Sequence, residues 1–267
     1  SASPWPPASF PVRSAGMAQI PRVLSIAGTD PTGGAGIQAD LKSIAAAGGF
    51  GMSVVTALVA QNTQGVREIH TPPQSFLRAQ LDAVFDDVEV DAVKIGMLGD
   101  TETTRTVADY LAAHPVPVVV VDPVMVATSG DRLLSADAEA ALRQLVADHA
   151  TVVTPNIPEL AVLTGESEPD SFDAAVELGQ RYAREADVQV LVKGGHLSGE
   201  RASNALVAPD GTTHVAEVPR VATKNTHGTG CSLSSALATR MALGSATDAI
   251  TWASEWLHEA IAHADEL

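Results

Sequence analysis

One stretch of the sequence decides the fold: VLSIAGTDPTGGAGIQADLK, residues 23–42. It opens on a short apolar run at residues 23–27, passes through a glycine-rich loop, and enters a segment with the apolar spacing of a helix at residues 35–47. A short strand that feeds a helix through a tight loop is the first half of a βαβ unit. The stretch therefore predicts a parallel sheet whose faces are covered by helices.

The same alternation of strand and helix patterns repeats along the chain. Further strands are predicted at residues 53–60, 92–95, 118–122, 151–154 and 188–192. Helices are predicted at residues 73–88, 101–114, 136–148, 157–163, 172–185 and 232–243, with a last helix from about residue 248 to the end. We expect helices on both faces of a mostly parallel sheet, which is a three-layer αβα fold of the α/β class.

Two segments near the C-terminus have their own patterns. In residues 204–218 the pair Asp210-Gly211 separates two alternating runs, which is a type I′ turn signal and predicts an antiparallel hairpin at the sheet edge. The last helix is predicted to pack against the sheet. Its apolar stripe consists of Ile250, Ala253, Leu257, Ile261 and Ala264.

The composition narrows the class of protein. At 267 residues with 45% hydrophobic content, the chain is long enough for one large domain, expected at residues 21–267 behind a disordered extension at residues 1–20. No apolar run approaches the ~18 residues of a membrane span. A single cysteine excludes an intrachain disulfide framework, and a formal net charge of −16 argues against binding nucleic acid. We expect a cytoplasmic protein that acts on a small molecule.

Ligands of such sheets bind beyond the carboxyl ends of the strands, so the residues that follow each predicted strand are the informative ones. These segments are rich in glycine and in polar side chains. They comprise residues 28–36, 61–63, 94–97, 122–125, 154–159 and 193–196. Because parallel strands end at the same edge of a sheet, the segments predict one shared binding site.

The first of these segments contains a loose G-x-G-x-x-A fingerprint at residues 34–39. Dinucleotide binding is disfavoured, because Gln61 and Asn62 stand where an acidic residue would hold a ribose. We interpret the loop as flexible backbone that approaches a small substrate closely, with Asp40 and Gln61 as polar side chains beside it. The alternative is a tight loop that only begins a helix.

Phosphate must be held without a P-loop, because no G-x-x-x-x-G-K-[ST] motif occurs. Residues 225–231 offer another route: Gly228 and Gly230 precede a small-residue helix, whose free amides and dipole favour an anion. Cys231 would lie in the first turn, where the helix end lowers the pKa of a thiol and makes a base or nucleophile available. The alternative is an inert, buried cysteine.

Carboxylates follow two of the predicted strands. Asp122 ends a run of four valines, and Asn156 with Glu159 opens a helix, which places carboxylates where Mg²⁺ could bridge nucleotide phosphates. A capping box explains Asn156 and Glu159 equally well. Lys193 and Lys224 could neutralise transferred charge, although an isolated lysine is more often solvated.

Together these segments resemble the bacterial hydroxymethylpyrimidine/phosphomethylpyrimidine kinases of thiamine biosynthesis. The resemblance spans the chain from residue 23 to about 267. It is carried by IAGTDPTGGAGIQADLK at residues 26–42, TALVAQNTQGV at 56–66, KIGML at 94–98, DPVMVATSGDRLL at 122–134, TPNIPE at 154–159, VKGGH at 192–196 and NTHGTGCSLSSALA at 225–238.

The resemblance implies a ribokinase-like fold and a homodimer that transfers the γ-phosphoryl of ATP to 4-amino-5-hydroxymethyl-2-methylpyrimidine and then to its monophosphate. It places Gly28, Asp40, Gln61, Met97 and Val124 at the pyrimidine, and Asn156, Lys193, Lys224 and Thr226 at ATP. Mg²⁺ would be held by Asp122 and Glu159, and Gly228, Thr229 and Gly230 would form an anion hole beside Cys231 as the general base.

Two other functions stay open on the sequence. The wider superfamily commonly has Asp where this chain has Cys231, and a related pyridoxal kinase subgroup shares the Gly-Thr-Gly-Cys loop. A non-catalytic pyrimidine-binding regulator is disfavoured by the intact Asp122, Glu159 and Cys231. The family usually continues into a Gly-rich, His-containing tail, and this sequence ends at residues 265–267; without such a tail its substrate contact would be lost, which bears on the second phosphorylation more than on the first.

Overall fold

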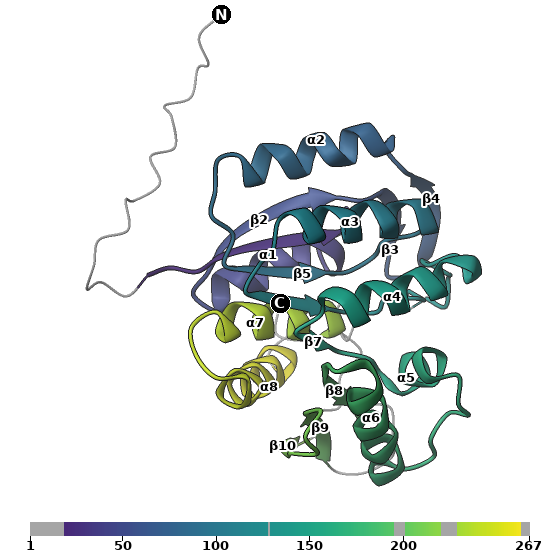
Figure 1. Cartoon of the computed structure of the whole chain (residues 1–267), viewed down its shortest axis with the longest axis vertical. Coiled ribbons are helices and arrows are strands. Elements are labelled where there is room, and N and C mark those ends of the chain that lie inside the picture. Colours follow the sequence, from purple (N-terminus) through teal and green to yellow (C-terminus); the bar gives the residue numbers. More distant parts are fainter. Residues whose placement is uncertain (1–18, 128, 195–200, 220–228, 263–267) are drawn as a thin grey trace, which may run out of the picture.

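The computed structural model describes residues 19–127, 129–194, 201–219 and 229–262 (Figure 1). Its centre is an eight-stranded sheet in the order β10-β9-β8-β7-β6-β5-β1-β2. The strands are β1 (Arg22–Ala27), β2 (Phe50–Val55), β5 (Ala92–Ile95), β6 (Val118–Val121), β7 (Val152–Val153), β8 (Gln189–Lys193), β9 (Arg201–Val207) and β10 (Thr213–Pro219). Strands β2 to β8 of this sheet pair in parallel, and β9 and β10 are antiparallel.

Two layers of helices cover the sheet, which confirms the predicted αβα fold. One layer holds α1 (Gly36–Ala46), α7 (Thr229–Met241) and α8 (Ala246–Ala262), and the other holds α2 (Gln74–Phe85), α3 (Thr101–Ala113), α4 (Glu139–His149), α5 (Ile157–Thr164) and α6 (Phe172–Ala186). A short 3₁₀ helix, Ala136–Ala138, leads into α4. Neighbouring strand residues alternate between the layers: Val119 and Val121 pack toward the α2–α6 layer and Val120 toward α7.

The strand order reverses between β1 and β5. The chain runs outward from β1 to β2, returns to place β5 on the other side of β1, and then continues outward through β6, β7 and β8. Loops on the two sides of such a reversal diverge and leave a crevice at the carboxyl edge. The loops after β1 and β5 flank this position, so the fold itself places the glycine-rich loop at a ligand-binding edge.

The strand predicted at residues 53–60 is wrong, because the chain leaves the sheet inside it. Thr56 N donates to Ala27 O at 2.9 Å and Thr56 Oγ1 donates to Met97 O at 2.7 Å, which ends β2. The chain then forms β3 (Leu58–Asn62), which pairs with β4 (Gly65–His70) in a separate two-stranded sheet. Strand β4 was not predicted from the sequence.

The C-terminal hairpin is confirmed, but its turn is not of type I′. Strands β9 and β10 pair antiparallel at the sheet edge, and Gly211 N donates to Ala208 O at 3.0 Å. Gly211 has a φ of +91°, whereas Asp210 is not among the described residues with positive φ. A type I′ turn needs positive φ at both central residues, so Pro209 and Asp210 instead form a right-handed turn ahead of the glycine.

Helix α8 packs as predicted against the sheet edge. Ile250 and Ala253 are fully buried and Leu257 is partly buried, against α7, β9 and β10. The side chain of Ile261 and all of Ala264 lie outside the described residues. None of the helices in the described part of the chain combines the length and apolar character of a membrane-spanning segment.

Candidate active site

The glycine-rich loop after β1 is shaped by Asp30, which is fully buried. One carboxylate oxygen accepts from the amide and hydroxyl of Thr32 at 2.9 and 2.8 Å, and the other accepts from the amides of Gly34 and Ala35 at 3.1 and 2.9 Å. The sequence reading assigned Asp30 no role. The available sign was an acidic residue three positions before Gly33 and Gly34, in a loop whose backbone amides need acceptors.

The same loop brings two backbone segments into contact. Ile37 N donates to Gly28 O at 2.9 Å, and a Cβ placed on Gly36 would collide with that carbonyl oxygen. Gly36 also has a φ of +57°, a conformation that glycine adopts without a steric penalty. The two ends of the loop therefore approach each other closely, while the predicted approach of this backbone to a substrate stays a prediction.

Four of the residues predicted to line a pyrimidine site lie in one region. A Cβ on Gly28 would be 2.9 Å from Met97 Sδ, and Gln61 Nε2 donates to Thr29 O at 2.9 Å. Met97 and Val124 belong to one apolar cluster with Val59. The loop after β1, the loop after β5 and the two-stranded sheet thus meet at the strand reversal.

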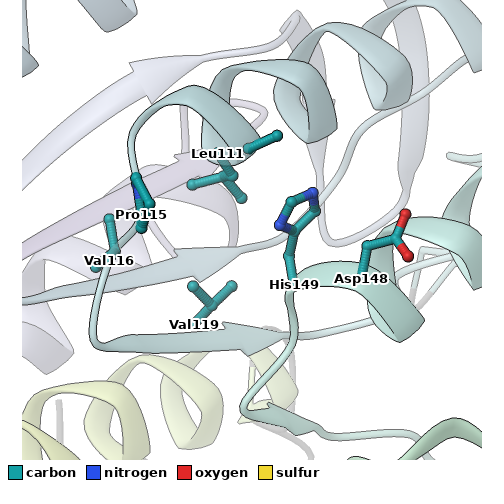
Figure 2. Close-up of a pocket in the computed structure, with 7 residues that line it drawn as sticks. Leu111, Pro115, Val116, Val119, Asp148 and His149 are labelled. Atoms are coloured by element: carbon teal, nitrogen blue, oxygen red, sulfur yellow. The ribbon is translucent and has the colours of Figure 1, made fainter.

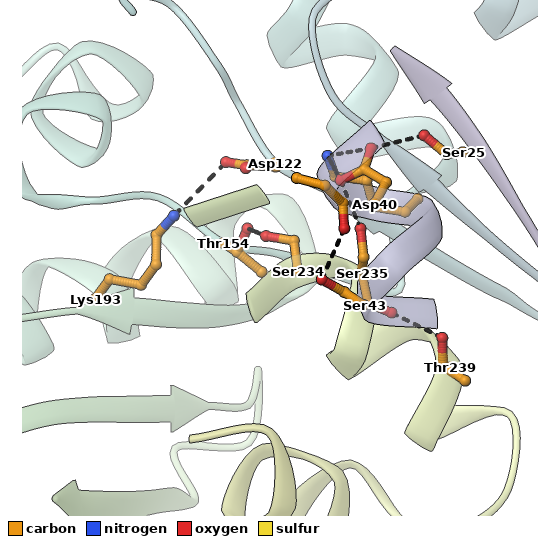
Figure 3. Close-up of polar contacts among 11 residues, drawn as sticks. Ser25, Asp40, Ser43, Asp122, Thr154, Lys193, Ser234, Ser235 and Thr239 are labelled. Atoms are coloured by element: carbon orange, nitrogen blue, oxygen red, sulfur yellow. Dashed lines mark hydrogen bonds and ion pairs between the residues drawn. The ribbon is translucent and has the colours of Figure 1, made fainter. Parts of the chain in front are cut away.

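Asp40 has a different environment from the one predicted. It was expected to offer a polar group to the substrate, but it is fully buried and both oxygens accept hydrogen bonds from Lys94 Nζ, at 2.9 and 3.0 Å. Ser25 and Ser235 each donate to it at 2.7 Å (Figure 3). All acceptor positions of the carboxylate are used within the protein. Lys94, a charge inside the apolar strand AVKI, was not assigned a role.

A second group of charges follows β6, β7 and β8. Lys193 Nζ lies 3.7 Å from Asp122 Oδ1, and the two side chains are mostly buried (Figure 3). Asn156 and Glu159 form a complete capping box at the start of α5, with each side chain accepting from the other's amide. Burial raises the pKa of Glu159 to about 7, against the opposing effect of Lys193, and Asp122 raises it further.

Cys231 lies in the first turn of α7, as predicted, but the expected lowering of its pKa is wrong. The residue is partly exposed, yet burial of the thiol raises its pKa to about 11. The ammonium of Lys94 lowers the pKa, Asp40 and Asp122 raise it, and a hydrogen bond from the backbone amide of Gly36 lowers it. Desolvation therefore outweighs the favourable end of the helix.

Several predicted site residues cannot be placed. Lys224, Thr226 and Gly228 lie outside the described residues. Thr229 and Gly230 form the beginning of α7, so the helix starts three residues before the predicted start at Ser232 and Gly230 lies inside it. The part of the anion hole that the structure describes is therefore the first turn of α7, directly before Cys231.

A pocket of about 280 Å³ lies away from this region (Figure 2). Its lining includes Leu111, Pro115, Val116, Val119 and His149, from the end of α3, the start of β6 and the end of α4. Strand β6 begins here, so the pocket is at the amino edge of the sheet. The lining brings together none of the residues predicted to bind substrate, nucleotide or metal.

A mostly parallel sheet between two helix layers, with a two-stranded sheet beside its carboxyl edge, is the architecture of ribokinase-like kinases. The structure of a Bacillus subtilis pyridoxal kinase in complex with ADP superposes with a TM-score of 0.83 at 33% identity, covering 92% of this chain and 93% of that one. The fold class predicted from the sequence is confirmed.

The family follows from two kinds of match. The family model described as phosphomethylpyrimidine kinase matches residues 30–267. A hydroxymethylpyrimidine/phosphomethylpyrimidine kinase of Escherichia coli is 46% identical over 245 residues, which cover 91% of this chain and 92% of that protein. The chain belongs to the phosphomethylpyrimidine kinase family.

A thiamine biosynthesis multifunctional protein of Corynebacterium efficiens is more similar still. It is 63% identical over 248 residues, which cover 92% of this chain but only 33% of that protein. The chain thus spans about a third of the length of this relative.

Proposed function

We propose that the chain is an ATP-dependent kinase that phosphorylates 4-amino-5-hydroxymethyl-2-methylpyrimidine and then its monophosphate. One observation carries the proposal: α1 and α7 pack side by side, and near their starts Ser235 Oγ on α7 donates to Asp40 Oδ1 on α1 at 2.7 Å. The loop proposed to hold the pyrimidine therefore adjoins the helix start proposed to hold the transferred phosphoryl group.

The pyrimidine site is proposed to be formed by Gly28, Gln61, Met97 and Val124, which the fold brings to one region. Asp40 supports this site from beneath instead of lining it, because its carboxylate is buried and saturated. ATP is proposed to contact Asn156, Lys193, Lys224 and Thr226. The first two lie side by side, since Asn156 and Lys193 form a parallel β-bridge.

Mg²⁺ fits the carboxylates after β6 and β7. In the described residues no group of three or more His, Cys, Asp or Glu side chains could hold a metal ion by itself. Mg²⁺ at kinase sites is commonly held by one or two carboxylates together with substrate phosphates, and Asp122 and Glu159 supply such a pair. We propose that they hold Mg²⁺, which would neutralise phosphate charge when bound.

Pyridoxal kinase activity is the second candidate, because the pyridoxal kinase fold superposes closely on this one. The pyrimidine is preferred because the Escherichia coli relative has the higher identity over nearly its whole length. Purified protein with ATP and Mg²⁺ should be given the pyrimidine, its monophosphate and pyridoxal in separate reactions. Turnover of the first two supports the proposal, preference for pyridoxal replaces it with the second candidate, and the absence of ATP turnover contradicts both.

We also propose that the chain forms a homodimer through the outer face of the two-stranded sheet. Leu58 is 53% exposed there, and Ala60 on the same face is also exposed. Light scattering after size exclusion checks this, and Leu58→Glu is expected to shift a dimer toward monomer. A monomeric wild-type protein contradicts it. The cytoplasmic location stays a prediction.

A further inference from the structure

The Asp40–Lys94 ion pair is the most deeply buried charged contact among the described residues. Lys94 Nζ lies 2.9 Å from Asp40 Oδ1, and both side chains are 0% exposed. Removing two charges from water has a large free-energy cost, so a buried pair needs good geometry and additional hydrogen bonds to persist. The roles proposed above leave Lys94 without a task, although it lies at the carboxyl edge.

The pair joins four elements that meet beneath the proposed site. Ser25 of β1 and Lys94 of β5 are register partners, so their side chains leave the sheet on the same face, toward α1 and α7. Asp40 reaches them from α1, and Ser235 of α7 donates to Asp40 at 2.7 Å. The carboxylate therefore fixes α7 to α1 and to the centre of the sheet (Figure 3).

The residues that connect α1 to α7 are spaced four apart on both helices. Asp40 lies four residues after Gly36 on α1, and Ser235 lies four residues after Cys231 on α7, so each pair shares one helix face. Ser235 donates to Asp40 one turn after Gly36 and Cys231, and the Gly36 amide lowers the pKa of the Cys231 thiol. The first turns of α1 and α7 thus lie against each other, and Cys231 is at the active-site end.

The charges around the thiol oppose one another. The ionisable groups that act on it are Lys94 from β5, Asp40 from α1 and Asp122 after β6. Lys94 favours the thiolate, and the two carboxylates disfavour it. Burial alone would lower the pKa of Lys94, but Asp40, Cys231 and Asp122 together raise it, so the lysine stays charged.

We propose that Lys94 is a positioning residue for Cys231: bonded to Asp40, which accepts from Ser235 one turn beyond Cys231 on α7, its ammonium group stabilises the thiolate form of Cys231. This inference rests on the proposed function, in which Cys231 takes the proton of the substrate hydroxyl. It adds no group to those that contact substrate. It assigns Lys94 an electrostatic task that a purely structural ion pair would lack.

The single cysteine allows a direct test on the whole chain. The rate of alkylation of Cys231 by iodoacetamide at pH 8 is proportional to its thiolate fraction, because pH 8 is well below the thiol pKa. Lys94→Met removes the ammonium and is expected to slow alkylation about three- to tenfold, and Asp40→Asn is expected to accelerate it by a similar factor. A pair that only holds the fold would not move the rate in opposite directions.

Ser234→Ala is the matched control. Ser234 lies on the same turn of α7 as Ser235 and shares a buried hydrogen bond of 2.8 Å with Thr154, which follows β7. It changes the packing of α7 without removing a charge, so its alkylation rate should stay within about twofold of the wild type. Equal rates in all variants, or a change of the same sign in Lys94→Met and Asp40→Asn, would overturn the inference. If Lys94→Met does not fold, the neutral pair Asp40→Asn with Lys94→Met should still slow alkylation, because Lys94 acts on the thiol more strongly than Asp40.

Kinase assays on the same variants separate this inference from the proposed function. The expected result is a change in kcat in the same direction as the alkylation rate, with the KM for ATP unchanged. If the wild type lacks kinase activity, the proposed function fails, and the alkylation rates still decide the link between Lys94 and Cys231. If alkylation is unaffected while the wild-type kinase is active, the link fails and the function stands.

Discussion

At the scale of the residue, Cys231 links two opposing effects: the helix end beside it favours a thiolate, and its burial favours the neutral thiol. Burial prevails and the pKa is raised to about 11. If the thiolate is the base, its fraction rises as protons are lost, so kcat should increase about tenfold per pH unit between pH 7 and pH 9. Steady-state kinetics over this range measure it.

The control is Cys231→Ala, which we expect to lower turnover strongly with little effect on folding. Its remaining activity should not increase with pH in this way, because the titrating thiol is gone. A steep rise with pH in Cys231→Ala, or near-normal turnover, would remove the base role and leave catalysis to positioning and charge stabilisation.

The raised pKa of Glu159 predicts a second pH dependence, that of the stability of the fold. Burial raises its pKa from 4.5 to about 7, so the folded state favours the protonated form. The protonated carboxyl therefore contributes to the free energy of unfolding. This contribution is fully present below pH 4.5 and is lost as the pH rises through 7, and it is on the order of 3 kcal/mol at most. Glu159→Gln keeps a capping side chain but cannot ionise. Without Mg²⁺ or nucleotide, its stability should fall less than that of the wild type between pH 5 and pH 8.

Urea unfolding at each pH measures this difference, and Glu102→Gln serves as the control. Glu102 is an exposed glutamate in the first turn of α3, so this substitution should leave the wild-type pH dependence unchanged. An equal pH dependence in the wild type and Glu159→Gln would show that the Glu159 carboxyl ionises without a folding penalty.

At the scale of the element, α1 has a positive-φ glycine at each end. Gly36 at its start has a φ of +57° and Gly48 after its end has a φ of +92°. Alanine at either position should lower the free energy of unfolding by roughly 1 kcal/mol, because its side chain disfavours a positive φ. Only Gly36→Ala also drives a Cβ into the carbonyl of Gly28, because nothing lies within 4 Å of the Gly48 position.

Gly36→Ala should therefore destabilise the fold by about 1–3 kcal/mol more than Gly48→Ala, as overpacking does elsewhere. Urea midpoints of the two variants give the comparison. Equal costs would mean that the contact between Gly28 and Gly36 relaxes freely, and the loop would then lack the rigid backbone approach described above.

Helix and strand ends that depend on residues close in the sequence were predictable. Those that depend on contacts between residues far apart in the sequence were not. The start of α5 follows from Asn156 and Glu159, which are three residues apart and cap the helix together. The end of β2 was missed because it depends on hydrogen bonds from Thr56 to Ala27 of β1 and to Met97 in the loop after β5. The start of α7 suggested a thiolate at Cys231, but the burial that opposes it comes from tertiary packing.

The same distinction holds for the candidate site. The glycine-rich loop was recognised because its glycines adjoin one another in sequence. The roles of Asp40 and Lys94 were not, because these residues are 54 positions apart and only the fold brings them together. A lysine inside an apolar strand was the available sign of a buried partner.

At the scale of the whole molecule, the two-stranded sheet β3–β4 lies at the other end from β9 and β10 (Figure 1). It is bound to the central fold by Thr29, whose hydroxyl accepts from Val59 N at 2.8 Å, and by Asp131, which accepts from Val66 N at 2.9 Å. Hydrogen bonds from Val66 and Ser129 lower the pKa of Asp131 and keep it ionised. Asp131 thus joins this sheet to the segment that follows β6.

The hydrogen bond of Asp131 to Val66 should affect binding of the pyrimidine, which we propose lies beneath the two-stranded sheet. Met97 and Val124, proposed to contact the pyrimidine, form one apolar cluster with Val66, the residue whose amide Asp131 binds. Asp131→Ala should loosen this cover and raise the KM for the pyrimidine several-fold, while the KM for ATP changes little, because the proposed nucleotide residues follow β7 and β8. Asp210→Ala is the control: Asp210 is also an exposed aspartate that accepts a backbone amide, but it lies in the β9–β10 hairpin. Equal KM values for the pyrimidine in the two variants, or a rise for ATP as large as that for the pyrimidine, would contradict a role of the two-stranded sheet in holding that substrate.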